Sequence, residues 1–263
     1  MARPVLIDTD AGVDDALALI LALRSPELDV KAISTVAGNV EVEQCTRNVF
    51  YLLRLLNENK IPVAQGASKP LAKRLVTAPE VHGEDGLGNT RPHVTIPRSM
   101  SRDAVGMILS LSKQYGKRLT IIALGPLTNI ARALKKDPRS LHNIGRLITM
   151  GGAFHVPGNT GPVAEFNYFV DPDAAHSVLN SGLPITVVPL DVTQQVVLMR
   201  RELEYRAKRR ANSVARAILR FTKFYMQYHR KTENFYGGYL HDPLAVTAAI
   251  EPGIVQTRKA HVV

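Results

Sequence analysis

The stretch "PVLIDTDAGVDDALALILALRS", from Pro4 to Ser25, decides the fold. Its first part, residues 4–8, is a short apolar run typical of a buried strand, and residues 14–25 are predicted to form the helix that follows it. Gly12, in the loop between them, permits a tight turn of the backbone. A strand that leads through a tight turn into a helix predicts the beginning of an α/β fold.

The same alternation of short apolar runs and helical patterns continues along the chain. Further strands are predicted at 30–38, 119–125, 146–152 and 183–191, and further helices near 42–57, 125–138 and 171–182. This order predicts a mostly parallel open sheet flanked by helices, of the Rossmann-like kind. Ligands of such sheets bind at the carboxyl ends of the strands, so the polar clusters that follow the strands should converge at one edge.

Length and composition limit the class of protein. The 263 residues carry no linker, low-complexity block or internal repeat, which predicts a single domain over 1–263. Cys45 is the only cysteine, so an intrachain disulfide and a thiolate metal cluster are both excluded. The N-terminus lacks the apolar core of a signal peptide, and no stretch reaches the roughly 18–20 apolar residues of a membrane span. We expect a cytoplasmic protein without a membrane partner.

The net charge of +10 raises the question of a nucleic-acid partner. Residues 199–231 hold eleven Lys or Arg and two Glu, so this one stretch carries 11 − 2 = +9 of the excess. Apolar residues alternate with the basic ones there, as in an amphipathic helix with a solvated face. A surface for acidic partners is the alternative. No nucleic-acid-binding motif is present, and we expect no nucleic-acid partner.

Four carboxylates, Asp8, Asp10, Asp14 and Asp15, fall within eight residues directly behind the first strand. Capping of the helix accounts for one or two acidic residues at its start, but not for four. A bound hard cation would offset their repulsion, and all-oxygen ligands suit calcium or magnesium. Adjacent helical residues point about 100° apart, so one of Asp14 and Asp15 could hold the metal while the other binds a neighbouring ligand.

The Asp-x-Asp pattern after an apolar strand also resembles the nucleophile motif of haloacid-dehalogenase-type phosphatases. In that alternative, Asp8 or Asp10 would be the nucleophile. It leaves Asp14 and Asp15 without a role.

The carboxylate loop resembles the N-terminal hallmark of the inosine–uridine-preferring nucleoside hydrolase family. The hallmark DTDxGxDDAxAL is matched by "DTDAGVDDALAL", with Ala11 where the family usually has Pro. The resemblance continues in order through "TVAGNV" (35–40), "HGEDGLGN" (82–89), "ALGPLTNIA" (123–131), "MGGAF" (150–154), "AEFNYFVDPDAA" (164–175) and "HDPLAV" (241–246). We expect the Ala11 difference to relax the turn slightly and to leave metal ligation intact.

The resemblance implies calcium-dependent hydrolysis of the N-glycosidic bond of ribonucleosides to ribose and free base, as in nucleoside salvage. It implies that Asp10, Asp15 and Asp242 ligate Ca²⁺ with their carboxylates and Leu124 with its main-chain oxygen. A metal-bound water is more acidic than free water, and Asp10 is our candidate general base beside it. The bond would break through an oxocarbenium-like sugar.

The resemblance also assigns residues to the ribose hydroxyls, each of which both donates and accepts. They are Asp14, Asn39, Asn159, Glu165 and Asn167. Glu165 and Asn167 straddle Phe166, so an extended segment would put both side chains on one face, next to the substrate. Ordinary loop amides are the alternative for the two asparagines, Asn159 and Asn167.

The leaving base needs a proton or a hydrogen bond. His241, next to Asp242, is the first candidate donor, and His82 is the second, although "HGEDGLGN" could be only a glycine-rich loop. Tyr225 and His229 lie one helical turn apart and could line the base pocket, with a plain amphipathic helix as the alternative. The resemblance suggests aromatic residues at both positions, so His229 leaves the choice of base open. Purine-specific relatives use tryptophans, and this chain has none.

The chain departs from the family at its end. It stops at "RKAHVV" (258–263), which we expect to be a strand, and the usual C-terminal strand and helix are not in the sequence. An inactive nucleoside-binding protein is therefore a second alternative to the hydrolase. We expect a homo-oligomer, dimer or tetramer.

Overall fold

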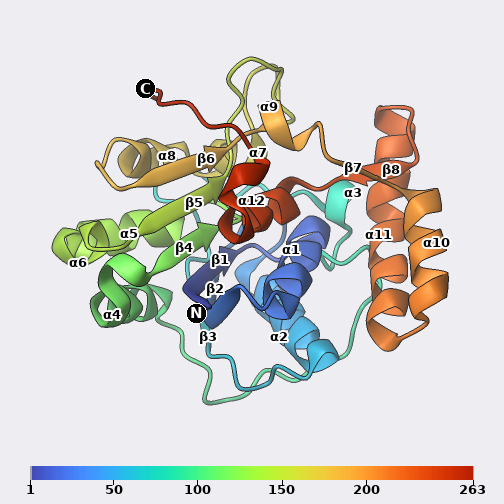
Figure 1. Cartoon of the computed structure of the whole chain (residues 1–263), viewed down its shortest axis with the longest axis horizontal. Coiled ribbons are helices and arrows are strands. Elements are labelled where there is room, and N and C mark those ends of the chain that lie inside the picture. The colour runs from blue at the N-terminus through green and yellow to red at the C-terminus, as the bar shows by residue number, and fades with distance from the viewer. Residues whose placement is uncertain (1, 263) are drawn as a thin grey trace.

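The computed structural model describes residues 2–262. Six strands form a parallel sheet in the order β3-β2-β1-β4-β5-β6, which confirms the predicted fold class (Figure 1). The strands are β1 (Arg3–Thr9), β2 (Leu28–Thr35), β3 (Val63–Gln65), β4 (Thr120–Ala123), β5 (Arg146–Met150) and β6 (Ile185–Val188). The strand order reverses between β1 and β4, and this reversal makes the point at which open α/β sheets bind ligands.

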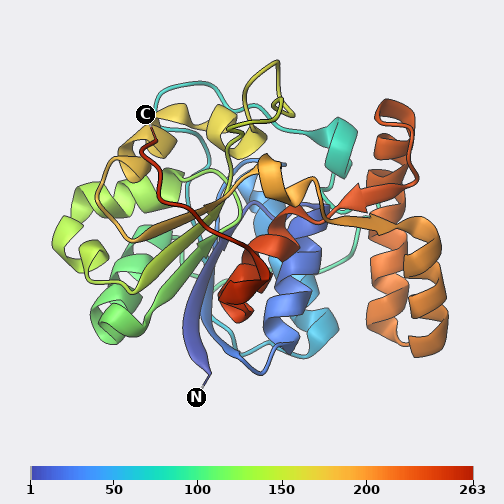
Figure 2. The ribbon, with the colours of Figure 1, turned by 45° about the horizontal axis from the view of Figure 1, so that its top comes forward.

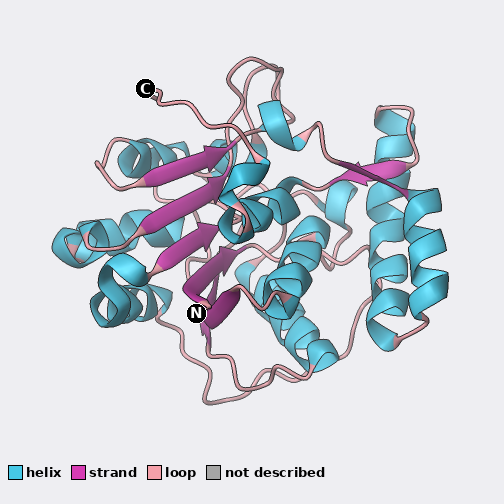
Figure 3. Ribbon diagram, viewed as in Figure 1, coloured by secondary structure: helices cyan, strands magenta, loops and turns pink. Residues whose placement is uncertain are grey.

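Helices cover both faces of this sheet (Figure 3). One face packs against α1 (Val13–Arg24), α2 (Val42–Leu56) and α12 (His241–Ile250). The other face packs against α4 (Ala104–Tyr115), α5 (Thr128–Lys136), α6 (Pro138–His142) and α8 (Pro172–Leu179). The short helices α3 (Pro79–His82), α7 (Phe166–Val170) and α9 (Leu190–Thr193), and the 3-10 turns Gly116–Arg118 and Pro252–Ile254, complete the connections.

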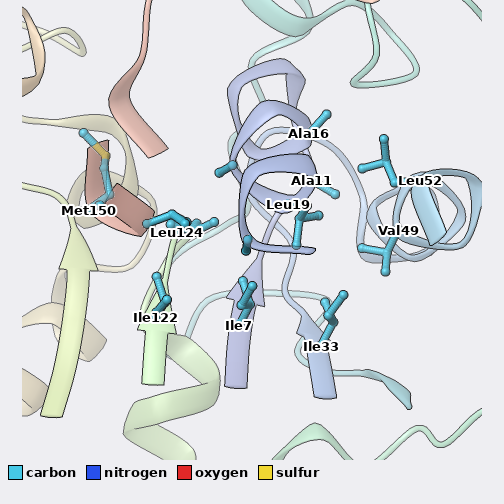
Figure 4. Packing of buried hydrophobic residues seen from close by; sticks show 14 of the residues in the cluster. Ile7, Ala11, Ala16, Leu19, Ile33, Val49, Leu52, Ile122, Leu124 and Met150 are labelled. Carbon is cyan, nitrogen blue, oxygen red and sulfur yellow. The ribbon is translucent and has the colours of Figure 1, made fainter. Parts of the chain in front are cut away.

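The strands are apolar on both sides because both sides are buried. Ile122, Ile7 and Ile33 of three neighbouring strands point to the same side of the sheet, where Leu19 of α1 lies above Ile7 and Leu52 of α2 lies above Ile33 (Figure 4). Their neighbours in sequence, such as Ile121, belong to the cluster under the opposite helices. A run such as "VLI" therefore reads as continuous rather than alternating, and it fixes β1 in the centre of the sheet.

The basic stretch lies outside this sandwich. β7 (Val197–Met199) and β8 (Gly237–Tyr239) form an antiparallel pair, and α10 (Arg200–Arg210) and α11 (Ser213–Thr232) project beside the body (Figure 2). The stretch is two helices rather than one, because Ala211 takes the left-handed conformation (φ 35°) and Asn212 caps α11. Most of its Lys and Arg side chains are exposed, as predicted for a solvated face.

Two other element predictions differ from the structure. Residues 258–262 form no strand, since no β-sheet pairing joins them to another segment in the described part of the chain. Val263 lies outside the described residues. The helix predicted over 125–138 begins only at Thr128 and is followed by the separate helix α6, because Asp137 leaves the helical conformation and caps the new start at Pro138. The strand β3 and the helix α4 were not predicted. The assignment of 1–263 to a single domain stays a prediction.

Among residues 2–262, none of the helices has the length and apolarity that crossing a membrane requires.

We predict that Ile122→Ala destabilises the protein by about 2–5 kcal/mol, because Ile122 is fully buried in the central strand β4 and its truncation leaves a cavity. Val163→Ala is the matched control, since Val163 is 76% exposed and should change the free energy of unfolding by about 0.5 kcal/mol at most. Urea titrations of the three proteins measure both values. A loss at Ile122 no larger than that at Val163 would contradict the assigned core.

Candidate active site

The predicted site residues gather at the carboxyl edge of the sheet, beside the reversal between β1 and β4. A cavity of about 290 Å³ opens there. Twelve of the fourteen predicted residues line it: Asp14, Asn39, His82, Leu124, Asn159, Glu165, Phe166, Asn167, Tyr225, His229, His241 and Asp242. The other two, Asp10 and Asp15, are fully buried.

Three carboxylates from opposite ends of the chain meet at this cavity. Asp14 and Asp15 begin α1, and Asp242 stands in the first turn of α12. One oxygen from each lies within 4.8 Å of the others, and all three side chains are buried. This arrangement can hold a metal ion. It brings Asp14, rather than the predicted ligand Asp10, together with Asp15 and Asp242.

The carboxylates strongly affect one another. Burial and then the charge of Asp15 raise the pKa of Asp14 to about 8. Burial, followed by the neighbouring carboxylates, raises the pKa of Asp10 and that of Asp242 well above the usual range. The ionised cluster is therefore unfavourable unless a positive charge joins it.

Few hydrogen-bond donors compensate this charge. Asp15 accepts from the Thr9 hydroxyl, from the Gly12 amide at 2.9 Å and from the Asn39 side chain at 3.1 Å. Asp10 Oδ2 accepts from the backbone amide of Asn39 at 2.7 Å. Asp10 Oδ1 is buried without a hydrogen-bond partner in the described part of the protein. An unpartnered carboxylate oxygen beside three further carboxylates fits a hard cation such as Ca²⁺ or Mg²⁺.

Asp8 does not belong to this cluster, although the sequence grouped it with the other three. Its Oδ1 accepts from the Ser34 hydroxyl and from the Asn129 amide at 2.8 Å. Burial raises the pKa of Asp8 to about 6. The fourth carboxylate of the cluster is Asp242, which only the folding of the chain brings near.

Two glycines make room for the Asp10 carboxylate. A Cβ atom at Gly38 would lie 2.1 Å from Asp10 Oδ2, and one at Gly125 would lie 2.9 Å from Asp10 Oδ1. Both distances are shorter than a Cβ atom can tolerate. Only glycine at positions 38 and 125 therefore lets the backbone lie this close to Asp10.

Ala11, where the family usually has Pro, adopts a backbone conformation that proline cannot take. Its φ of 45° is left-handed, whereas proline fixes φ near −65°. The turn therefore has a conformation that a proline could not adopt. The expectation that Ala11 leaves metal ligation intact stays a prediction. A left-handed alanine next to Asp10 stores local strain at the site.

The segment that carries Glu165 and Asn167 is helical rather than extended. Glu165 caps α7, and its carboxylate accepts from the backbone amides of Asn167, Gly152 and Tyr168 at 2.8–3.2 Å. The side-chain amide of Asn167 donates to the Leu124 carbonyl at 2.8 Å and to the Met150 carbonyl at 3.2 Å. The predicted extended segment is therefore a capped helix, and its hydrogen bonds join α7 to the ends of β4 and β5.

Asn159 reaches the same place from the loop after β5. Its Oδ1 accepts from the Phe166 amide at 2.9 Å, so it helps to shape the loop as well as lining the cavity.

The other end of the cavity is built from histidines and aromatic rings. The Val13 amide donates to His82 Nδ1 at 3.1 Å, and the His82 ring stacks on Tyr225 with 5.7 Å between centroids. His229 Nδ1 donates to the Tyr225 carbonyl at 2.9 Å. Burial, followed by the nearby histidines, lowers the pKa of both His82 and His241 to about 3. Both rings are therefore neutral at neutral pH and can offer an N–H.

Several lining residues were not predicted: Tyr228, Thr232, Glu233, Tyr239, Met150 and Gln194. Tyr228 and Thr232 lie three positions after Tyr225 and His229, so helical spacing could have identified them. Gln194 and Tyr239 carried no local signal, since only the fold brings their segments to the cavity.

Comparisons with known proteins agree with this geometry. Residues 5–263 match the family model described as "Inosine-uridine preferring nucleoside hydrolase". The chain is 41% identical over 259 residues to the pyrimidine-specific ribonucleoside hydrolase RihA of Enterobacter sp. (strain 638), covering 98% of this chain and 82% of that relative.

Two solved structures are similar as well. A plant nucleoside hydrolase, the PpNRh1 enzyme, gives a TM-score of 0.91 at 37% identity, covering 97% of this chain and 81% of its own. A purine-preferring ribonucleoside hydrolase from Gardnerella vaginalis gives 0.92 at 35% identity, covering 98% and 83%. No comparison supports a phosphatase or an inactive binding protein. The chain belongs to the inosine–uridine preferring nucleoside hydrolase family and is a ribonucleoside hydrolase.

Proposed function

We propose that the protein hydrolyses the N-glycosidic bond of pyrimidine ribonucleosides in a calcium-dependent reaction that serves nucleoside salvage. The observation that carries the proposal is the buried carboxylate cluster beneath a cavity of about 290 Å³. The cluster needs a cation, and the cavity offers amides and carboxylates to a sugar on one side and rings to a base on the other.

Asp10, Asp15 and Asp242 would hold the cation together with the main-chain oxygen of Leu124. All four are oxygen donors, which suits calcium with its 6–8 oxygen ligands. The Leu124 carbonyl accepts from Asn167 at 2.8 Å, so that amide would help to orient it. When bound, the cation supplies a more acidic water and binding sites for sugar hydroxyls.

Asp10 is the proposed general base. Its Oδ2 is fixed by the Asn39 amide, which leaves Oδ1 without a partner and able to accept a proton. Attack of the activated water on the anomeric carbon breaks the bond to the base, and the bonding electron pair leaves with the base.

The ribose would be held by Asp14, Asn39, Asn159, Glu165 and Asn167, with Phe166 beside it. Glu165 already accepts three hydrogen bonds, out of roughly four that a carboxylate can take. This leaves it one acceptor position for a sugar hydroxyl. Asn39 is likewise committed to Asp10 and Asp15, so it links the sugar to the metal site.

His241 is the proposed donor to the leaving base, and His82 is the second candidate. Both rings line the cavity and are neutral, so an imidazole N–H can donate to the base as negative charge develops. Tyr225 and His229 would contact the base.

The preference for pyrimidines rests on the similarity to relatives named pyrimidine-specific and on the absence of tryptophan. His229 and Glu233 stand together at the base end, with 3.9 Å between His229 Nε2 and Glu233 Oε1. A polar pair suits the amide and carbonyl groups of a pyrimidine. The homo-oligomer and the cytoplasmic location stay predictions.

We predict ribose release from uridine and cytidine, slower release from inosine, and loss of activity with a chelator that added calcium restores. A reducing-sugar assay over these nucleosides, with metal analysis of the purified protein, measures this. Phosphate release from phosphate esters in the same preparation would favour the phosphatase alternative. Full turnover by metal-free protein would contradict the calcium dependence.

We predict that Asp10→Asn lowers kcat by more than about 100-fold, or about 2.7 kcal/mol, because at constant volume it removes the base and the negative charge that would face the metal. Asp173→Asn is the matched control, because Asp173 is an exposed carboxylate on α8 that should leave turnover unchanged. Steady-state kinetics with uridine decide it. A residual rate within about tenfold of wild type, a loss of only about 1.4 kcal/mol, would rule out the assigned role.

We predict that the metal-free protein becomes less stable as the pH rises from about 4 to about 8. Unfolded Asp and Glu lose their protons near pH 4, whereas burial holds the pKa of Asp14 at about 8 and that of Glu165 at about 7. In that window the folded carboxyl groups keep protons that the unfolded ones have lost, so their contribution favours unfolding as the pH rises. His82 and His241, with a folded pKa of about 3, act in the opposite direction only below about pH 6.5, where unfolded histidines bind protons, so the loss of stability is clearest between about pH 6.5 and about pH 8.

Calcium replaces those protons, so it should raise Tm more at about pH 8 than at about pH 5. Thermal melts with and without calcium measure the difference, and Asp242→Asn should weaken it. A Tm of the metal-free protein that rises with pH would show that the cluster is not protonated as described.

A further inference from the structure

The short helix α9 lies directly behind His241. It follows β6, the edge strand of the sheet, and ends at Thr193, which is fully buried. The Oγ1 atom of Thr193 lies 2.7 Å from His241 Nδ1. Figure 2 shows α9 next to the start of α12, the helix that begins with His241.

The Thr193 hydroxyl is committed to this ring. Among residues 2–262, His241 is the one hydrogen-bond partner of the Thr193 side chain. The imidazole also lies beside the Tyr239 ring, with 5.3 Å between centroids and 40° between the ring planes. His241 itself lines the cavity, so its orientation is set from behind by Thr193 and from the side by Tyr239.

The direction of this hydrogen bond is tied to which nitrogen of His241 carries the proton. A neutral imidazole has one N–H and one bare nitrogen, and a hydroxyl can either donate or accept. If the hydroxyl donates to Nδ1, the ring proton must be on Nε2. Only in that tautomer does a neutral His241 have a donor that can face the cavity.

We propose that Thr193 is a positioning residue: its hydroxyl donates to His241 Nδ1 and so holds the Nε2–H toward the leaving base. The proposal rests on the proposed function, because it assumes that His241 serves the leaving group. Thr193 is not among the residues that line the cavity, so it acts through His241. It fixes both the angle and the tautomer of a ring that would otherwise rotate.

Asp191, two residues earlier on α9, has a different task. Its two carboxylate oxygens accept from the backbone amides of Phe154 at 2.8 Å and His155 at 2.7 Å, in the loop that leads to Asn159. Changing Asp191 therefore disturbs α9 and this loop without removing the contact to His241. It is a matched comparison for Thr193.

The kinetic test compares uridine with p-nitrophenyl β-D-ribofuranoside, whose leaving group needs no proton. Thr193→Val keeps the shape of the side chain and removes the hydroxyl. We expect it to lower kcat/KM for uridine by about 10- to 100-fold and to leave the nitrophenyl substrate within about threefold of wild type. Thr193→Ser should restore most of the uridine activity, and Asp191→Asn should lower both substrates by a similar factor. Equal losses on both substrates in Thr193→Val would overturn the proposal.

A second measurement does not depend on turnover. Nitrogen-15 NMR of the histidine rings, with His241 assigned by its loss in His241→Asn, reports which nitrogen is protonated. We expect protonation on Nε2 in the wild type and a mixture of tautomers in Thr193→Val. A wild-type ring protonated on Nδ1, or an unchanged ring in Thr193→Val, would overturn the proposal. A wild type that cleaves neither substrate would overturn the proposed function, and the NMR result would still decide the role of Thr193.

Discussion

The mutual repulsion of buried carboxylates is the constraint on which the rest of the site depends. Asp10, Asp14, Asp15 and Asp242 are all buried, and burial raises the pKa of each of them. Water cannot screen them, and the few donors nearby, chiefly the Asn39 side chain and two backbone amides, do not neutralise them. Such a cluster is stable only when protons or a cation offset its negative charge. The fold therefore favours binding of a cation at this site.

Space at the edge of the sheet is the second constraint. The cluster must lie where β1 and β4 diverge, and Asp10 fits there only because Gly38 and Gly125 bring backbone instead of side chain against it. The two glycines follow β2 and β4, so three neighbouring strands jointly shape the position of one carboxylate. The site is therefore a property of the sheet edge and not of the N-terminal loop alone.

The sequence predicts those parts of the molecule whose signal is local. The apolar run before Asp8 predicts β1. The family motifs contain nine of the predicted residues that line the cavity, and Asn159, Tyr225 and His229 were predicted from outside those motifs. Long-range features escape local patterns: the Asp8 carboxyl pairs with Ser34 and Asn129 instead of joining the cluster, because strand neighbours are not visible from one strand. The extended conformation predicted for the segment around Glu165 was wrong for another reason. Its spacing to Asn167 suits either an extended segment or a helix cap, and the amides of three residues favour the cap.

The two ends of the cavity are built on different parts of the fold, and this separation has a consequence. The carboxylates and sugar-side amides stand at the sheet edge and on α1, α7 and α12, inside the packed body. Tyr225, His229 and Tyr239 stand on α11 and β8, which lie beside the sheet (Figure 1). Side chains there can change without altering the distances between the carboxylates. Two solved relatives share the fold at TM-scores of 0.91 and 0.92, and one of them is named as purine-preferring. On this reasoning we expect the choice of base to depend on residues of α11 and β8 rather than on the carboxylate cluster.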